Sequence, residues 1–254
     1  MAGTDREYSQ QWSNDEVRVD IPFSAAGVGT TIVLTSRFTD SMMLLDVGDG
    51  AVRDLLSIRN SSDWVGNLDL VAISHGHFDH VGGLHTLLSF MRMLQRREAL
   101  NVLIPKGCAE AITIVKGYRS VYLDTLPYET HLYELSDGSG FDTDFFKVQA
   151  FGVEHYSLEH GSPDVLIPAL GFRVRIGTTT VAYTGDTRLC PAAEAIVEGA
   201  DLAIIEATRG TTPSGLDRVH LSVEEATRLG ARAKDFLLIH RIPQYPKWTP
   251  SEEA

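Results

Sequence analysis

Three histidines and one aspartate stand within six positions of the stretch Ser74–His80, which reads Ser-His-Gly-His-Phe-Asp-His. The chain has only 9 histidines in 254 residues. At that frequency a His-x-His-x-Asp-His pattern arises by chance on the order of once in a thousand such chains. Imidazole nitrogens and a carboxylate oxygen suit zinc, iron and manganese. The sequence therefore predicts a metal site, directly after the apolar run 70–73, which has the character of a strand buried on both faces.

The composition limits which classes of partner and which cellular compartment are expected. A hydrophobic fraction of 43% is enough for a substantial core. With 22 basic and 34 acidic residues the net charge is −12, which argues against a large polyanion as main partner but not against a small phosphorylated one. Cys108 and Cys190 form no metal-binding pattern and are expected as free thiols in a reducing compartment. Because the sequence has neither an apolar run near ~20 residues nor a signal-peptide core, we expect a soluble cytoplasmic protein without a membrane segment.

The periodicity of the apolar residues predicts a β-rich first part and then alternating strands and helices, in two passes. Strands are expected at 17–21, 31–34, 42–45, 70–73, 102–104, 132–135, 145–153, 171–176, 180–183, 202–205 and 236–239, and helices at 51–58, 84–97, 109–115, 191–197 and 223–234. This order indicates an α+β protein, an αββα sandwich of two mixed β-sheets flanked by helices. We expect a flexible lead-in over 1–15, a single domain over 16–242 and an irregular tail over 243–254.

Four further polar residues each close an apolar strand: His155, Asp186, Glu206 and His240. Sites in folds of this type collect at the carboxyl ends of strands, so these side chains are expected beside the first cluster. Taken singly, each has a plainer explanation. A histidine at a strand end is often only hydrogen-bonded, and Asp186 could cap a helix. His160 competes with His155, which we favour because it directly ends its strand.

The series of motifs resembles the ligand series of the metallo-β-lactamase superfamily over about residues 30–241. The motifs are His75-Gly76-His77-Phe78-Asp79-His80, His155, Thr184-Gly185-Asp186-Thr187 and His240. The resemblance implies an αββα sandwich with two metal ions, usually Zn²⁺, for which Mn²⁺ or iron can substitute. It implies that His75, His77 and His155 hold the first ion, that Asp79, His80 and His240 hold the second, and that Asp186 bridges them. Asp46 matches a position that orients the ligands from behind.

Three segments near the C-terminus, 204–208, 219–226 and 238–240, resemble the ribonuclease Z branch and its phosphodiesterase relatives. Glu206 and His220 match a pair that stands beside the metals there. Cleavage of a phosphodiester needs a nucleophile and a proton for the leaving alkoxide. A hydroxide bridging the metals would supply the first, with Asp79 steering the proton of the water, and His220 held by Glu206 would supply the second. The plainer reading of His220 is a neighbour of Ser222, which would cap the helix 223–234.

Substrate contacts are less clearly marked. Arg188, Arg209, Arg218 and Arg241 lie near the motifs and either grip a phosphate or belong to a solvated surface. Tyr156 opens a segment, 156–168, that is rich in Gly, Ser and Pro and is expected to cover the metals, where it and His160 could touch substrate. The interval from His155 to Asp186 is too short for the arm that grips tRNA in tRNA-processing members. The sequence thus favours a small or short phosphodiester over tRNA. A homodimer is compatible with it.

Three other functions remain open at this point. The same metal site could hydrolyse a lactone, a thioester or another carboxylic ester, with Tyr156 or Tyr183 holding the carbonyl oxygen. An iron-dependent redox member is a second alternative, although the diiron branch typically has a carboxylate at the position of His77. A non-catalytic binding protein that kept the fold is a third, and the complete ligand series counts against it.

Overall fold

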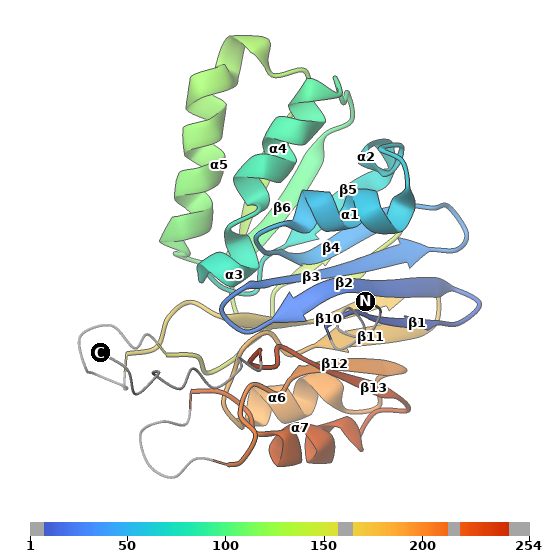
Figure 1. Ribbon diagram of the computed structural model, residues 1–254, viewed down its shortest axis with the longest axis vertical. Coiled ribbons are helices and arrows are strands. Elements are labelled where there is room, and N and C mark those ends of the chain that lie inside the picture. Colours follow the sequence, from blue (N-terminus) through green and yellow to red (C-terminus); the bar gives the residue numbers. More distant parts are fainter. Residues whose placement is uncertain (1–7, 157–164, 213–218, 244–254) are drawn as a thin grey trace, which may run out of the picture.

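The computed structural model describes residues 8–156, 165–212 and 219–243. Two β-sheets pack face to face, and helices cover the outer face of each (Figure 1). This is the αββα sandwich that the sequence predicted. None of the helices in the described part of the chain combines the length and the apolar character that a membrane crossing requires.

The first sheet has seven strands in sequential order, antiparallel from β1 to β4 and parallel from β4 to β7. They are β1 Gln10–Ser13, β2 Val17–Ala25, β3 Gly29–Ser36, β4 Met42–Val47, β5 Leu68–Ala72, β6 Leu100–Pro105 and β7 Thr130–Leu135. Its outer face carries α1 Ala51–Arg59, α2 Trp64–Asn67, α3 Phe78–Val81, α4 Leu84–Met93, α5 Ala109–Tyr122 and the 3-10 turn η1 Leu123–Thr125.

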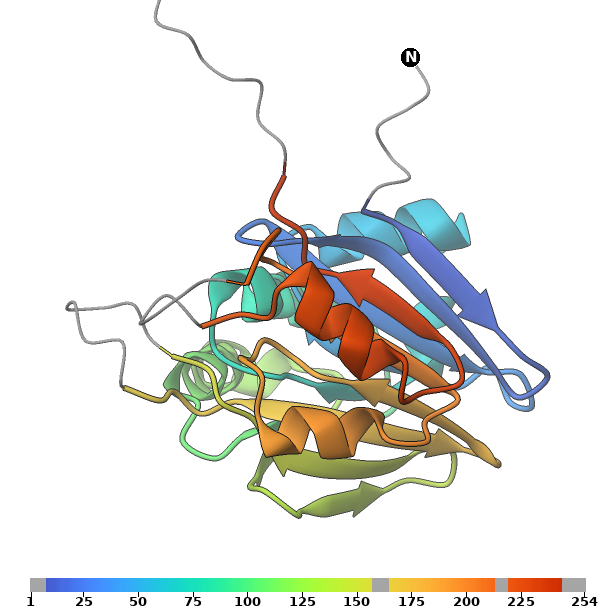
Figure 2. The same ribbon diagram turned by 90° about the horizontal axis from the view of Figure 1, so that it is seen from below.

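The second sheet has six strands in the order β13-β12-β11-β10-β9-β8. They are β8 Gly140–Asp142, β9 Lys147–Gly152, β10 Leu170–Ile176, β11 Thr179–Tyr183, β12 Leu202–Glu206 and β13 Phe236–Ile239. Two helices cover it, α6 Pro191–Val197 and α7 Val223–Gly230 (Figure 2). Strands β11, β12 and β13 are mutually parallel, and β9 runs in the same direction because it is antiparallel to β10. Their carboxyl ends therefore lie at one edge.

The inner strands β3 to β6 of the first sheet are buried on both faces, which explains their continuous apolar runs. In β4, Met43 and Leu45 pack into the core between the two sheets, whereas Met42 and Leu44 pack under the helices. This two-sided burial is what a parallel sheet inside a layered fold requires. The motif-bearing loops consequently emerge from strands that are held rigidly on both sides.

The structure corrects several expectations at the level of elements, among them the ends of α4 and α7, which lie at Met93 and Gly230 instead of at 97 and 234. Strand β1 lies inside the predicted lead-in, and it pairs with β2 from Gln10↔Ile21 to Ser13↔Arg18. Helix α5 continues to Tyr122 instead of ending at 115, because the buried Tyr118 ring packs inside and its hydroxyl donates to the Leu88 carbonyl. The short elements α2, α3, η1 and β8 were not predicted, because so few residues show no periodicity. Residues 1–7 and the tail from 244 lie outside the described residues.

Candidate metal centre

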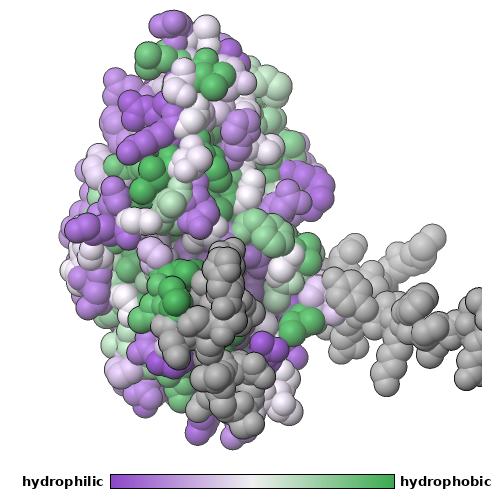
Figure 3. Space-filling model, turned by 90° about the vertical axis from the view of Figure 1, so that its left-hand side faces the viewer, coloured by the Kyte–Doolittle hydropathy of each residue, from purple (hydrophilic) through white to green (hydrophobic). Residues whose placement is uncertain are grey.

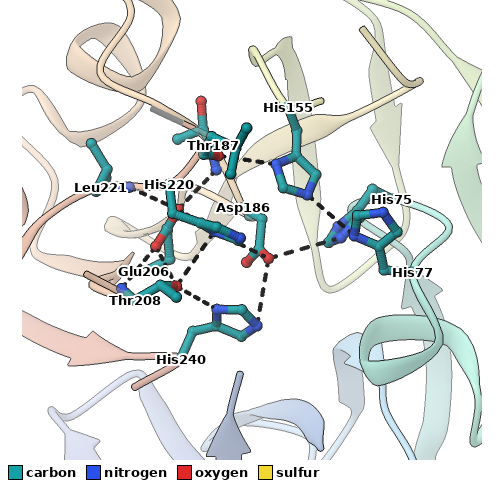
Figure 4. Close-up of polar contacts among 12 residues, drawn as sticks. His75, His77, His155, Asp186, Thr187, Glu206, Thr208, His220, Leu221 and His240 are labelled. Atoms are coloured by element: carbon teal, nitrogen blue, oxygen red, sulfur yellow. Dashed lines mark hydrogen bonds and ion pairs between the residues drawn. The ribbon is translucent and has the colours of Figure 1, made fainter. Parts of the chain in front are cut away.

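Polar side chains from five chain segments meet at the edge where the parallel strands end (Figure 4). His75 and His77 follow β5, and Asp79 and His80 lie in α3. His155 follows β9, Asp186 follows β11 and His240 follows β13. The structure thus brings together all seven residues that the sequence nominated as ligands: His75, His77, Asp79, His80, His155, Asp186 and His240.

One half of the cluster has the donor spacing of a single tetrahedral ion. His240 Nε2 lies 3.2 Å from His80 Nε2, 3.2 Å from Asp79 Oδ2 and 3.4 Å from Asp186 Oδ2. His80 Nε2 lies 3.5 Å from Asp186 Oδ2. Ligand atoms at zinc–nitrogen bond length on a tetrahedron are about 3.3 Å apart. These four side chains could therefore hold one metal ion with little movement.

The other half of the cluster also has two donor atoms at this spacing, and it contains two buried polar atoms without a hydrogen-bond partner in the described structure. His155 Nε2 lies 3.2 Å from His77 Nδ1. His75 Nε2 is buried without a hydrogen bond in the described structure, and so is Asp186 Oδ1. A buried polar atom without a partner costs free energy, and a cation coordinated there would satisfy both. The chemistry of the donors and these two atoms fit a metal-binding role.

The distal ring nitrogens of the histidines are fixed by hydrogen bonds from behind. His75 Nδ1 lies 3.0 Å from Ser74 Oγ, and His80 Nδ1 lies 2.7 Å from Asp46 Oδ2. In each of these residues the tethered Nδ1 leaves Nε2 to face the cluster. The same holds for His155, tied to the Val219 carbonyl at 3.2 Å, and for His240, tied to the Thr208 hydroxyl at 2.7 Å. Such partners orient metal ligands.

Asp46 lies behind the cluster, as the resemblance implied. Its fully buried carboxylate accepts hydrogen bonds from the Ser74 amide at 2.6 Å, the Ser74 hydroxyl at 2.7 Å and the Tyr183 hydroxyl at 2.6 Å, besides His80. Sequence reasoning missed this role of Ser74 and of Thr208, although both stand next to or within the motifs. It also proposed Tyr183 as a holder of a carbonyl oxygen, which is wrong because its buried hydroxyl is engaged by Asp46.

The ionisation states of His75, His155 and Asp79 suit cation binding. Burial lowers the pKa of His155 to about 4 and that of His75 well below its ordinary value. Burial raises the pKa of Asp79, but the hydrogen bond from His240 and the charges of His80 and His240 bring it down to about 2. A metal ion takes neutral imidazoles and ionised carboxylates, and these groups are already in those states near neutral pH. At His80, burial lowers the pKa but the charges of Asp186 and Asp46 raise it well above its ordinary value, so a metal ion would displace a proton there.

Beside the cluster, His220 is held against Glu206. His220 Nδ1 lies 3.0 Å from Glu206 Oε1, and its ring centre lies 5.1 Å from that of His155. Burial lowers the pKa of His220, but the charge and hydrogen bond of Glu206 and the charge of Asp186 raise it to about 9. The cap of α7 is Ser222, whose Oγ accepts from the Glu225 amide at 3.1 Å, so His220 itself has no capping role.

Glu206 is fully buried and is itself anchored on all sides. It accepts from the backbone amides of Thr187 at 3.2 Å, Thr208 at 3.0 Å and Leu221 at 3.1 Å, and from the Thr208 hydroxyl at 2.8 Å. These contacts fix the position of the carboxylate. A fixed negative charge therefore stands against His220 Nδ1, which is the arrangement that keeps an imidazole protonated and correctly oriented.

Comparison with known proteins identifies the family. A sequence model of the family described as "Beta-lactamase superfamily domain" matches residues 44–240. The chain belongs to this superfamily. The superfamily member from Metallosphaera sedula named ribonuclease Z is 28% identical over 243 residues, covering 80% of this chain and 79% of that protein. The ribonuclease Z of Thermococcus gammatolerans is 28% identical over 250 residues, covering 82% of this chain and 77% of that protein.

Solved structures of the superfamily share the fold. The metallo-beta-lactamase fold protein YhfI from Bacillus subtilis superposes with a TM-score of 0.71 at 20% identity, covering 92% of this chain and 89% of that one. The short form of human tRNase Z gives a TM-score of 0.70 at 21% identity, covering 88% and 92%. The predicted family, its ribonuclease Z-like branch and the class of metal-dependent hydrolase are confirmed.

The residues that were predicted to contact substrate have different environments in the structure. Arg188 forms an ion pair with Glu154 and stacks over the buried Tyr156 ring at 4.8 Å. Arg209 is different, because its Nε is buried and has no hydrogen-bond partner among the described residues, while its charge acts on His220. Arg241 joins the loop after β2 through its backbone. Arg218 and His160 lie outside the described residues.

Proposed function

We propose that this chain is a dinuclear zinc-dependent phosphodiesterase, with Mn²⁺ or iron as substitutes for Zn²⁺. The observation that carries the proposal is the Glu206–His220 pair beside a ligand cluster with two sets of donors. The relatives named ribonuclease Z support the same reaction class. His75, His77 and His155 would hold one ion, Asp79, His80 and His240 the other, and Asp186 lies between the two sets.

Bound ions of this kind supply Lewis-acid polarisation of a phosphoryl oxygen and lower the pKa of coordinated water. The protein's own groups would do the rest. His220, kept protonated by Glu206, donates a proton to the leaving alkoxide. Asp79 accepts or steers the proton of the attacking water while its Oδ2 stays fixed by the Gly27 amide at 2.7 Å.

Arg209 is the arginine best suited to bind a phosphate oxygen in this scheme. Its guanidinium has no ion pair in the described structure, whereas Arg188 is already neutralised by Glu154. The amide of Arg209 donates to the Leu221 carbonyl at 3.1 Å, so its backbone is tied to the segment that carries His220. We also propose a single catalytic domain that extends from β1 to about residue 242.

The test compares His220→Ala with His131→Ala in the zinc-loaded full chain. His131 is an exposed histidine paired with Glu129 and serves as the matched control. We expect about two metal ions per chain in all three proteins, and a kcat loss of about 10²–10⁴-fold only in His220→Ala. The loss should be larger for a dinucleotide than for bis(p-nitrophenyl) phosphate, because an alkoxide needs the proton more than p-nitrophenolate does.

The substrate panel also contains a lactone, a thioester and a tRNA with a 3′ extension. The tRNA is included because relatives carry the name ribonuclease Z and one neighbour is a tRNase Z. Fully metal-loaded enzyme without phosphodiesterase activity, or with undiminished activity in His220→Ala, would contradict the proposal. Turnover of the lactone or thioester that does not depend on His220 would point to carbonyl chemistry instead.

A further inference from the structure

Exposed apolar side chains occur in the chain segments that carry the predicted ligands or hydrogen-bond to them. Figure 3 views the molecule from the side on which α3 and the grey loops lie in Figure 1, and apolar residues are visible there beside the grey atoms. The exposed large apolar residues that adjoin the centre are called the apolar rim here: Val28, Phe78, Val165, Leu166 and Ile242. Isolated apolar residues on a surface need no explanation, but a group gathered at a reactive site does.

Two members of the rim are attached to Asp79. Phe78 stands between His77 and Asp79 in the chain, and 62% of it is exposed. Val28 belongs to the turn after β2, and the amide of Gly27 in that turn donates to Asp79 Oδ2 at 2.7 Å. The Gly27 φ of 69° is a left-handed conformation that glycine adopts without strain. Both apolar side chains are thus anchored through a residue of the centre.

Ile242 belongs to a different segment of the chain, two residues after His240. The carbonyl of Arg241 accepts from the amide of Ala26 at 3.1 Å, so Ile242 adjoins the turn that carries Val28. The rim is therefore continuous here across two segments that are more than two hundred residues apart in sequence.

Val165 and Leu166 complete the rim beside His155. Leu166 forms a β-bridge with Tyr156, and the next amide, that of Ile167, donates to the His155 carbonyl at 3.0 Å. Three residues further on, Ala169 forms a bridge with His75. This segment therefore lies against both His75 and His155 and presents two exposed apolar side chains there.

The charge of the surroundings does not match a polyanion. The whole chain carries −12, and the Arg188 guanidinium beside Tyr156 is neutralised by Glu154. Phosphates that flank the scissile bond of a nucleic acid would need cations, whereas an apolar surface makes their desolvation costly. One phosphate at the centre with an uncharged, apolar organic group beside it fits the rim better.

We propose that the apolar rim binds an aryl or alkyl group of the substrate, so that this enzyme prefers phosphodiesters with an apolar substituent on the non-leaving side. The inference rests on the proposed phosphodiesterase function and adds the substrate class. Covering about half of a phenyl ring would raise kcat/KM roughly tenfold over a methyl group.

The test uses two probes with the same leaving group, phenyl p-nitrophenyl phosphate and methyl p-nitrophenyl phosphate. Each kcat/KM is divided by the rate of the same probe with hydroxide, which removes the difference in intrinsic reactivity. We expect a normalised ratio of roughly ten for the metal-loaded enzyme. Phe78→Ala and, separately, Leu166→Ala should each lower the ratio at least about threefold. Leu166→Ala is independent of any effect of Phe78→Ala on its two ligand neighbours.

Phe38→Ala is the matched control. Phe38 is 66% exposed, as Phe78 is 62% exposed, but it lies in the turn between β3 and β4. That turn is at the end of β3 opposite Val28, roughly 25 Å away for a strand of this length. The control should keep the wild-type ratio.

A binding measurement without turnover completes the test. Calorimetry should show phenylphosphonate binding roughly tenfold more tightly than methylphosphonate, with the preference reduced in both rim variants. A wild-type ratio near one, or a ratio unchanged in both variants, overturns the inference. So does loss of a dimer in Phe78→Ala with an unchanged ratio, because the rim would then be a subunit interface. If neither ester is hydrolysed, the proposed function fails, and the phosphonates still decide the role of the rim.

Discussion

At the scale of single residues, unusual backbone conformations at two positions orient side chains in or behind the metal centre. Asp46 and His240 both have positive φ, at 61° and 57°. This region is unfavourable for residues other than glycine, and it is retained where the surroundings demand it. Asp46 is held there by Ser74, Tyr183 and His80, and His240 by Thr208 and by the Ser24 hydroxyl, which accepts from its amide at 3.1 Å. The strain is located at the predicted ligand His240 and at Asp46, which orients the predicted ligand His80.

Asp46→Asn should weaken metal binding by about 10–100-fold, because an amide cannot accept four hydrogen bonds and loses the negative charge that orients His80. Competition with a zinc chelator measures the affinity. Asp49→Asn, at an exposed aspartate three residues away, is the control and should bind zinc as wild type does. Equal affinities in the two variants would show that Asp46 does not support the metal ligands.

At the scale of elements, the start of α7 positions the segment that carries His220. Ser222 and Glu225 form a capping box, in which the Ser222 hydroxyl accepts from the Glu225 amide at 3.1 Å and Glu225 Oε2 accepts from the Ser222 amide at 3.0 Å. The preceding amide, that of Leu221, donates to Glu206. The helix start and the buried glutamate thus hold the segment with His220 from both sides.

Ser222→Ala should lower the free energy of unfolding by about 1–2 kcal/mol, because the first turn of α7 loses its cap. The Glu206–His220 contact should loosen with it and lower kcat. Urea denaturation and phosphodiester turnover measure the two effects. Thr227→Ala, within the same helix and exposed, should change stability by less than about 0.5 kcal/mol. Full stability of Ser222→Ala would argue against this role of the cap.

At the scale of the whole molecule, Glu16 ties the two sheets together away from the metal centre. It lies just before β2 of the first sheet and accepts hydrogen bonds from the amides of Thr178 and Thr179, at 2.9 Å and 2.7 Å, in the turn between β10 and β11. Strand β1 adds a second tie, since the side-chain amide Nε2 of Gln10 donates to the Leu238 carbonyl at 2.7 Å. The two sheets are therefore joined by polar contacts as well as by the apolar core between them.

Glu16→Gln should destabilise the fold most at neutral pH. The hydroxyl of Thr179 and the neighbouring donors hold the pKa of Glu16 below its ordinary 4.5. A carboxylate with a lowered folded pKa stabilises the fold above its unfolded pKa, and this stabilisation is lost as the pH falls through the folded value. The difference between wild type and variant, from unfolding curves at several pH values, should shrink below about pH 4.5. Asp15→Asn, at the exposed neighbour, should show a smaller difference.

Much of this protein was predictable from the sequence because the relevant signals are local. His75, His77, Asp79 and His80 lie within six positions, and each further predicted ligand lies within three residues of the end of a strand whose burial pattern is visible in the chain. The bounds of α6 and β13 were predicted to the residue for the same reason. Polar residues that follow parallel strands gather at the edge where those strands end. The sandwich and the residues of the site were therefore predictable from patterns within single segments.

The tertiary structure alone decided what depends on distant partners. Strand β1 is short and its burial alternates only weakly, so only its pairing with β2 and its contact with Leu238 reveal it. The hydrogen bond between Asp46 and Tyr183 joins residues 137 positions apart, and the apolar rim joins four separate segments. Hydrogen bonds and surfaces of this kind leave no periodic pattern in a chain, because they arise only when folded elements meet.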